Sequence, residues 1–345
     1  MWIELAQPDA TYRPGEVVAG VVVVDTGGDV KCDALTVTLA WYTHGKGNRA
    51  KGPPDTVSLG AHAWKEGVQA RHSFQMEMPS GPLTHRGHLI NVDWQLTARA
   101  DIPWAIDPKA EHPLVLIPGV PGGGGAMQAQ GYRDAARVTP MKYDPGTDRP
   151  GVPSSRTRTG CGVVFMLPFI AAGVSLMVAG FRSSVWEVLF GAAFTITPSV
   201  VIVGLLTQAM AKRALGSPRQ WLEPSAPRAG DAITAHLAFA PARRLKLNAV
   251  RMDLICEEIA VSGSGTNTHT HTHRLHESRQ DGQVGDGIIT AADEAHFQLR
   301  FEIPPDAPPS FCASHNEVRW SLKAHVDIDG WPDWDGEEVF ALEPQ

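Results

Sequence analysis

The 345-residue chain is poor in cysteine, and this scarcity limits both its fold and its compartment. Its four cysteines, Cys32, Cys161, Cys256 and Cys312, show neither the pairing of a disulfide framework nor the spacing of a metal site. A reducing compartment is therefore expected for the folded parts. The chain also begins without a basic stretch or an apolar signal core, so we do not expect its N-terminal part to be exported.

An excess of positive charge is also missing. Lys and Arg number 30 against 37 Asp and Glu, which gives a net charge of -7. Proteins that bind nucleic acid carry a basic footprint on the binding domain. Nucleic acid is therefore not an expected partner of this chain.

The motifs of common catalytic sites are absent as well. The sequence has no Gly-x-Ser-x-Gly nucleophile turn, no His-Glu-x-x-His zinc motif and no Cys/His pair in a supporting context. The adjacent acids Glu257-Glu258 and Glu337-Glu338 would point to opposite faces of a strand, and we expect them to be solvated. The sequence thus predicts no enzyme, no catalytic residue and no cofactor.

Charge is lacking altogether from two long apolar runs, residues 161–181 and 188–211. A helix of about 20 apolar residues crosses a hydrocarbon core of about 30 Å. Only a short link, residues 182–187, separates the runs, so they predict a transmembrane helical hairpin with two spans. Buried core helices are the alternative, but soluble helices of this length keep a polar face.

Basic residues flank the outer ends of the two runs: Arg156, Arg158, Lys212, Arg213 and Arg219. The link between the runs carries one Arg and one Glu. Because basic residues favour the cytoplasmic side, both soluble domains are predicted to be cytoplasmic. No ionisable residue lies inside either run, so we expect an anchor in the cell membrane and not a route for ions or protons.

The chain contains an internal repeat on either side of these runs. Residues 13–41 align without a gap to residues 228–256, and residues 92–102 align to residues 318–328. Both copies alternate apolar and polar residues with a period of two, between turns rich in Gly, Pro and Asp. Short strands at this spacing predict one β-sandwich per copy.

The predicted fold is all-β with one helical insertion: two tandem immunoglobulin-like β-sandwiches and a two-helix transmembrane hairpin between them. The first sandwich covers residues 1–118 and the second covers residues 216–345. A Gly/Pro-rich segment at residues 119–160 is expected to act as a flexible linker, and the hairpin takes residues 161–211.

Two segments of the sequence resemble a known protein family. Tyr12-Arg-Pro-Gly-Glu-Val-Val-Ala-Gly-Val-Val-Val is similar to the opening of the arrestin-like N-terminal domain, and Asn91-Val-Asp-Trp-Gln-Leu-Thr-Ala resembles the late strand of that domain. Residues 228–340 resemble a second, more diverged copy. The arrestin-like superfamily includes arrestins, the retromer cargo-binding subunit and bacterial sporulation-control proteins. The resemblance implies tandem sandwiches that act by binding proteins.

The chain departs from the arrestin plan in ways that bear on function. A membrane hairpin between the sandwiches would replace recruitment to a membrane by permanent residence there. No Pro-Pro-x-Tyr motif is present, since Pro53-Pro54 is followed by Asp-Thr. The charged contacts by which visual arrestins sense phosphate have no counterpart that can be mapped, so receptor desensitisation is not inferred.

A tract of alternating Thr and His runs from Thr268 to His276. On a strand, His269, His271 and His273 would share one face, at a spacing of about 6.5 Å that is wide for a single ion. With His276, these imidazoles are candidate ligands for zinc, copper or nickel, although no metal is assigned. A pH switch and an exposed strand are the alternatives, because His changes charge between about pH 5 and 8 and Thr favours strands.

Two further segments are candidate contacts with a partner or with lipid. The loop at residues 45–52 is basic and glycine-rich, lacks the order of a phosphate loop, and would suit acidic headgroups. Near the C-terminus, two tryptophans lie among acids and would either cap the core or dock a partner; Trp104, near the corresponding place in the first copy, favours capping. The candidate residues are Lys46, Arg49, Lys51, Trp331 and Trp334.

Together these features predict a membrane-anchored, arrestin-like scaffold or adaptor that holds a protein partner at the cytoplasmic membrane face. The alternative is a sensor or accessory subunit of a membrane complex that reads metal, pH or lipid through the His tract or the basic loop. The lipid bilayer and an unidentified protein are the expected partners. The oligomeric state does not follow from the sequence.

Overall fold

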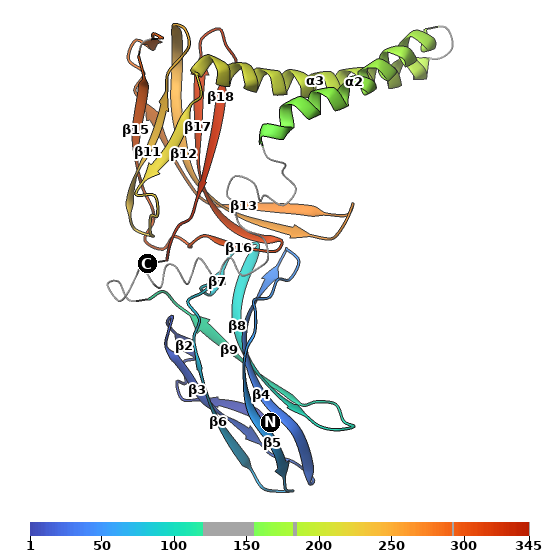
Figure 1. Ribbon diagram of the computed structural model, residues 1–345, viewed down its shortest axis with the longest axis vertical. Coiled ribbons are helices and arrows are strands. Elements are labelled where there is room, and N and C mark those ends of the chain that lie inside the picture. Colours follow the sequence, from blue (N-terminus) through green and yellow to red (C-terminus); the bar gives the residue numbers. More distant parts are fainter. Residues whose placement is uncertain (120–154, 182–184, 292, 345) are drawn as a thin grey trace.

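The computed structural model describes residues 1–119, 155–181, 185–291 and 293–344, and strands dominate it (Figure 1). Most of the predicted linker at 119–160 and part of the predicted link at 182–187 lie outside the described residues. The strands form two separate units, one from each copy of the repeat, and a pair of helices lies between them in sequence.

The N-terminal sandwich consists of two sheets. One sheet has the order β1-β3-β6, and the other has the order β2-β9-β8-β4-β5 with β7 beside β8. All pairs are antiparallel except β2 with β9. Its strands are β1 (Trp2–Leu5), β2 (Thr11–Tyr12), β3 (Val17–Val24), β4 (Val30–Gly45), β5 (Asp55–Trp64), β6 (Ala70–Glu77), β7 (His85–Arg86), β8 (Ile90–Asp101) and β9 (Lys109–Leu116).

The C-terminal sandwich also has two sheets. One has the order β10-β11-β15, and the other has the order β13-β12-β17-β16, with β14 beside β12 and β18 beside β17. Its strands are β10 (Arg219–Glu223), β11 (Ala232–Phe239), β12 (Leu245–Ser262), β13 (His269–Gly282), β14 (Ile288–Ile289), β15 (Ala295–Glu302), β16 (Phe311–Ala313), β17 (Asn316–Ile328) and β18 (Trp334–Phe340).

The two sandwiches share one strand order, as the internal repeat requires. Strands β1-β3-β6 correspond to β10-β11-β15, and β9-β8-β4-β5 correspond to β18-β17-β12-β13. The repeated turns match as well: Gly15 and Gly230 both have positive φ, at 79° and 88°. This backbone conformation is accessible to glycine without strain, which explains why glycine stands at both places.

Period-two alternation places the core of each sandwich. Along β4, Leu35, Val37, Leu39 and Trp41 are buried, and the residues between them are more exposed. On β17, Val318, Trp320, Leu322 and Ala324 are buried on one face in the second unit. Each fully buried aliphatic or aromatic side chain stabilises the fold by roughly 1.5–3 kcal/mol, so these faces fix the register of the strands.

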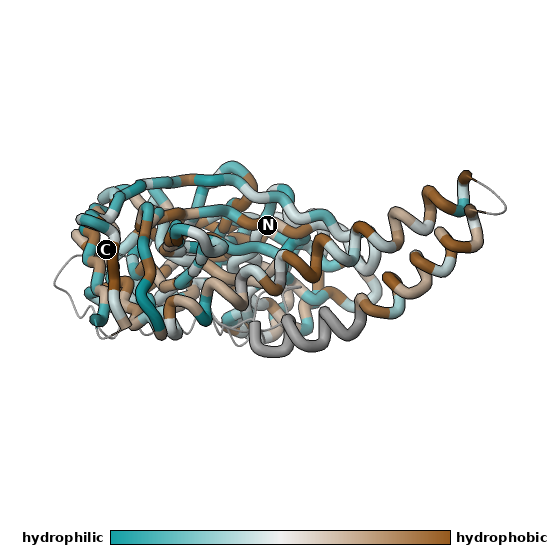
Figure 2. The backbone as a smooth tube through the Cα atoms, turned by 90° about the horizontal axis from the view of Figure 1, so that it is seen from above, coloured by the Kyte–Doolittle hydropathy of each residue, from teal (hydrophilic) through white to brown (hydrophobic). Residues whose placement is uncertain are grey.

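The helices α2 (Ser155–Gly180) and α3 (Val185–Leu215) pack against each other as a hairpin. Glycines allow the close approach: a Cβ atom on Gly173 would lie 2.8 Å from the carbonyl oxygen of Gly191, and one on Gly191 would lie 2.7 Å from the backbone nitrogen of Met177. Figure 2 shows the hairpin projecting from the body of the molecule as a largely apolar element.

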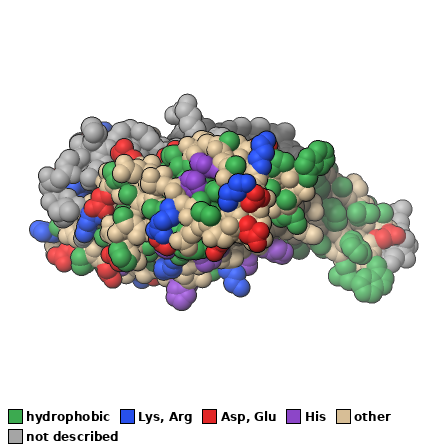
Figure 3. All heavy atoms as spheres, turned by 90° about the horizontal axis from the view of Figure 1, so that it is seen from below, with side chains coloured by type: hydrophobic (Ala, Val, Ile, Leu, Met, Phe, Trp, Pro, Cys, Tyr) green, Lys and Arg blue, Asp and Glu red, His purple; other side chains and the backbone are tan. Residues whose placement is uncertain are grey.

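The end of α3 is part of the C-terminal sandwich. Ala211, Ala214 and Leu215 are buried, and α3 contacts β18. Farther along the hairpin, large apolar side chains are exposed, among them Val178, Phe190 and Val200. Figure 3, seen from below, shows hydrophobic side chains along the part of the hairpin that projects from the body. Among the described residues, the hairpin is therefore held to the sandwich through the end of α3.

The prediction of two membrane spans is confirmed in part among the described residues. Helix α3 is long and apolar enough to cross a membrane, whereas the apolar described part of α2, Met166–Gly180, is shorter than a span. The first uncharged run, 161–181, begins in residues whose side chains are not described. In the part of the chain that the structure describes, one helix, α3, thus has the length and composition of a membrane span.

Candidate functional site

The two sandwiches meet through equivalent turns of the repeat. Asn48 belongs to the basic loop of the first copy, and its backbone N–H donates to the carbonyl of Val261 at 2.8 Å. Its side chain exchanges two hydrogen bonds with Gly263, donating to the carbonyl at 2.7 Å and accepting from the N–H at 3.1 Å. The loop at 45–52 therefore lies at the junction between the sandwiches.

Asn316, at the start of β17, closes this part of the junction. Its side chain is buried, and Nδ2 donates to the carbonyl of Asn48 at 2.7 Å and to Oγ1 of Thr43 at 3.1 Å. Gly47 packs directly on it: a Cβ atom there would collide with the Asn316 amide and lie 2.8 Å from the carbonyl oxygen of His315. The fit leaves no room for a side chain at residue 47.

Glu258 is the central polar residue of the junction. Its side chain is fully buried, and its hydrogen-bond partners come from the other sandwich: His85 Nε2 lies 2.8 Å from Oε1, and the Leu89 N–H donates to Oε2 at 2.7 Å. Burial raises the pKa of Glu258, but these hydrogen bonds outweigh it and hold the pKa below its ordinary value. The buried carboxylate therefore stays ionised.

The expectation that Glu258 is solvated is wrong. It lies on β12, which is flanked by β13 and β17 and is not an edge strand. A register shift between Cys256 and Glu257 accompanies the change of environment. The sequence did carry a signal, because Glu258 follows the buried residues Leu254 and Cys256 at intervals of two. An acid at such a position requires partners from another element.

The His tract forms the first part of β13, but its imidazoles do not converge. His269 is exposed, His271 Nε2 lies 3.3 Å from Ser262 Oγ, and the His276 ring is tilted against Trp320 with ring centroids 5.7 Å apart. His273 instead contacts His88 of the N-terminal sandwich, with centroids 4.0 Å apart. No group of three or more His, Cys, Asp or Glu side chains among the described residues could hold a metal ion.

The basic residues of the junction loop remain on its surface. Lys46, Arg49 and Lys51 are exposed, and the guanidinium of Arg49 lies 4.1 Å from the centroid of the Tyr42 ring. The backbone N–H of Lys46 donates to the Leu89 carbonyl at 2.8 Å. The backbone of the loop thus builds the junction, while its charges face solvent.

The two C-terminal tryptophans lie in different environments. Trp334 on β18 is buried, as the capping interpretation requires, and so it is not available to a partner. Trp331 is half-buried, with the Arg243 guanidinium 4.4 Å from its ring centroid. Trp104, by contrast, is fully exposed, so the inferred correspondence with a capping residue in the first copy is wrong.

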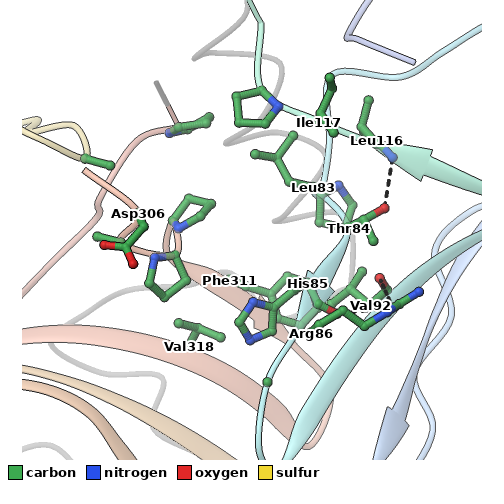
Figure 4. A pocket seen from close by; sticks show the side chains of 18 of the residues that line it. Leu83, Thr84, His85, Arg86, Val92, Leu116, Ile117, Asp306, Phe311 and Val318 are labelled. Atoms are coloured by element: carbon green, nitrogen blue, oxygen red, sulfur yellow. Dashed lines mark hydrogen bonds between the residues drawn. The ribbon is translucent and has the colours of Figure 1, made fainter. Parts of the chain in front are cut away.

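An open pocket of about 680 Å³ lies at the junction, between the two sandwiches (Figure 4). Its wall is mostly apolar and contains several prolines from both units. The N-terminal unit supplies Pro82, Leu83, Thr84, His85, Arg86, Gly87, His88, Val92, Val115, Leu116, Ile117 and Pro118, and the C-terminal unit supplies Ala229, Leu275, Pro305, Asp306, Ala307, Pro308, Pro309, Phe311, Val318 and Pro344.

Most polar groups around the pocket are already engaged. His85 is bonded to Glu258, Arg86 forms an ion pair with Asp93, and Thr84 Oγ1 accepts from the Leu116 N–H at 2.9 Å, as the dashed line in Figure 4 marks. Asp306 lines the opposite wall and is exposed. The rest of the wall is mostly apolar, so the geometry suits binding of apolar groups.

Sequence reasoning anticipated few of these residues. It singled out the basic loop and the His tract, and the structure places parts of both at the junction. It missed His85, Glu258, Asn316 and the pocket, because no local pattern indicates that segments more than 160 positions apart will meet.

No protein-family model matches the chain, and no curated protein sequence matches it. Among solved structures, the crystal structure of Spo0M, a sporulation control protein from Bacillus subtilis, is similar to this chain at 19% sequence identity with a TM-score of 0.30. The similarity covers 37% of this chain and 49% of the Spo0M chain, so it spans about half of that protein.

Proposed function

We propose that this chain is a membrane-anchored adaptor of arrestin-like architecture that binds a protein partner at the cytoplasmic membrane face. The observation that carries the proposal is the open apolar pocket at the junction of two hydrogen-bonded sandwiches. Pockets at domain interfaces with a few polar groups in an apolar wall are typical binding sites. The shared strand order and the Tyr12-Arg-Pro-Gly-Glu segment support the arrestin-like architecture.

The anchor in this proposal is the α2–α3 hairpin, crossing the bilayer twice. The apolar exposed surface of the hairpin and the length of α3 support it. Lys212 and Arg213 follow the apolar part of α3, and Arg156 and Arg158 precede that of α2, so basic residues flank the end from which the sandwiches continue. The positive-inside rule then places both sandwiches in the cytoplasm.

The partner is expected to insert an extended segment with apolar side chains into the pocket. Leu83, Ile117 and Phe311 offer apolar contacts from both units (Figure 4). Asp306 adds an exposed carboxylate to the wall, and it would favour a basic residue in the partner segment.

Site-specific photo-crosslinking in the full-length protein tests this proposal. A photoreactive residue at Ile117, on the pocket wall, is expected to capture one protein in membranes, and Ala307→Glu should abolish that capture by filling and charging the pocket. The control is the same residue at Val68, an exposed position outside the pocket wall. Equal capture from both positions, or capture unaffected by Ala307→Glu, would contradict the pocket as the binding site.

Removing the hairpin distinguishes the adaptor from the alternative function, an accessory subunit of a membrane complex. Replacing residues 156–209 by a flexible linker keeps the buried residues Ala211, Ala214 and Leu215. Capture through Ile117 that survives this replacement supports an adaptor whose binding surface is in the sandwiches. Capture that requires the hairpin supports the subunit alternative.

One observation favours the sensor alternative: the ring of His273 in the tract contacts the ring of His88 across the junction, with centroids 4.0 Å apart. The metal version of this alternative has a separate test. Zinc, copper or nickel should raise the unfolding temperature of the protein and should lose that effect in His271→Ala; no metal effect in the parent protein would exclude it.

A further inference from the structure

The loop between β8 and β9, residues 102–108, presents large apolar side chains to solvent. Trp104 is 106% exposed and Ile106 is 96% exposed, the highest values among the large hydrophobic side chains that the structure describes. Trp104 lies between Pro103 and Ala105, so the tip of the loop is apolar throughout. A tryptophan left fully in water at a loop tip needs an explanation, because contiguous exposed apolar groups mark interaction sites.

The loop is held in this shape by its own contacts. The Ala105 N–H donates to the Ile102 carbonyl at 3.2 Å, and the Asp107 carboxylate accepts from Arg99 Nε at 2.9 Å and from the Ile102 N–H at 3.3 Å. Trp104 has φ of 61°, a left-handed conformation that is unfavourable for a bulky residue. The backbone therefore accepts strain that turns the side chain outward, a feature found at functional sites.

The direction in which the loop projects also bears on what it contacts. In Figure 1 it projects from the N-terminal sandwich toward the same side of the molecule as the α2–α3 hairpin. The charges next to it balance, with Arg99 and Lys109 against Asp101 and Asp107. Attachment through this loop would thus depend on apolar insertion and not on attraction between opposite charges.

We propose that the 102–108 loop inserts Trp104 and Ile106 into the interfacial layer of the bilayer that the hairpin crosses. This inference rests on the proposed membrane anchoring and adds a second attachment point, which belongs to the other sandwich. Tryptophan suits this layer because its ring is apolar and its N–H remains hydrogen-bonded to water or headgroups. Ile106 adds an aliphatic group beside it.

The test uses the full-length protein reconstituted in vesicles of phosphatidylcholine and phosphatidylglycerol. Cys161→Ser and Cys312→Ser leave Cys32 and Cys256, which are buried. A single environment-sensitive fluorophore is then placed at one of three positions: Ala105→Cys in the loop, Val17→Cys as an exposed control on β3, or Ser175→Cys in α2. Lipids carrying nitroxide groups report contact with the bilayer by quenching.

The label at residue 105 is expected to show blue-shifted emission and quenching by nitroxides near the headgroups, unchanged at high salt. The label at residue 17 should remain solvent-like, and Trp104→Ala with Ile106→Ala should abolish the quenching at residue 105. Quenching at residue 175 without quenching at residue 105 would overturn the loop inference and leave the anchor intact. Absence of quenching at residue 175 would overturn the anchor itself.

Discussion

At the scale of single residues, Glu258 is the side chain whose substitution should be most informative. Glu258→Gln keeps its size but turns one hydrogen-bond acceptor into a donor facing the Leu89 or His85 N–H. We expect a loss of about 1–3 kcal/mol in the free energy of unfolding, the usual magnitude for a charge-assisted hydrogen bond. Urea unfolding of the detergent-solubilised protein measures it.

The neighbouring acid provides the matched control. Glu257 pairs with Arg274 at 3.2 Å at a partly exposed position. Exposed ion pairs contribute about 0–1 kcal/mol, so Glu257→Gln should change the unfolding free energy much less. Equal losses for the two variants would show that the buried carboxylate contributes no more to the free energy of unfolding than the partly exposed one.

Lowering the pH should weaken the contacts of Glu258 with His85 and Leu89. Because hydrogen bonds hold the folded pKa of Glu258 below its ordinary value of 4.5, the carboxylate contributes stability that is present above that value. The contribution is lost as pH falls through the folded pKa. The stability difference between the parent protein and Glu258→Gln should therefore be constant above about pH 6 and shrink below about pH 4.5. A difference that grows in acid would contradict this assignment.

At the scale of elements, the hairpin depends on glycines at the helix contact. Gly173→Ile should force α2 and α3 apart, since a Cβ atom at residue 173 already approaches the Gly191 carbonyl and Thr195. Disulfide formation between Phe169→Cys and Phe194→Cys, whose rings are 6.5 Å apart, reports the separation as a lower yield. Gly204→Ile is the control, because nothing lies within 4 Å of a Cβ atom there; an equal fall would refute the glycine contact.

Elements are also the scale at which the sequence was most predictive. Strands such as β4 and β8 were predicted from their alternation, because each buries one face against a core. The helices were recognised from uncharged runs. The environment at the strand ends could not be predicted: Trp104, in the loop before β9, is exposed, whereas Trp334, the first residue of β18, is buried. The difference lies in loop conformation, which alternation does not encode.

At the scale of the whole molecule, the junction should respond to a single methyl group. Gly47→Ala would collide with the Asn316 amide and the His315 carbonyl, so it should loosen the hydrogen bonds between Asn48 and Gly263. Faster hydrogen exchange in peptides covering 46–52 and 261–268 measures this. Gly28→Ala, with nothing within 4 Å, should leave exchange unchanged. Unchanged exchange in Gly47→Ala would mean that the sandwiches are not held together there.

The junction also has a consequence for biosynthesis. Asn316 bonds to groups made 268 and 273 positions earlier, and the segment between them contains the whole hairpin. Domains fold in the order in which the ribosome releases them. The junction groups of the first sandwich therefore remain unpaired until the proposed anchor has been inserted. Only a hairpin that returns to the starting side lets the halves meet. If the proposed anchor crosses the bilayer twice, the junction would form only in a correctly inserted chain, because a misinserted chain would leave Glu258 buried without partners or hydrated in an open domain.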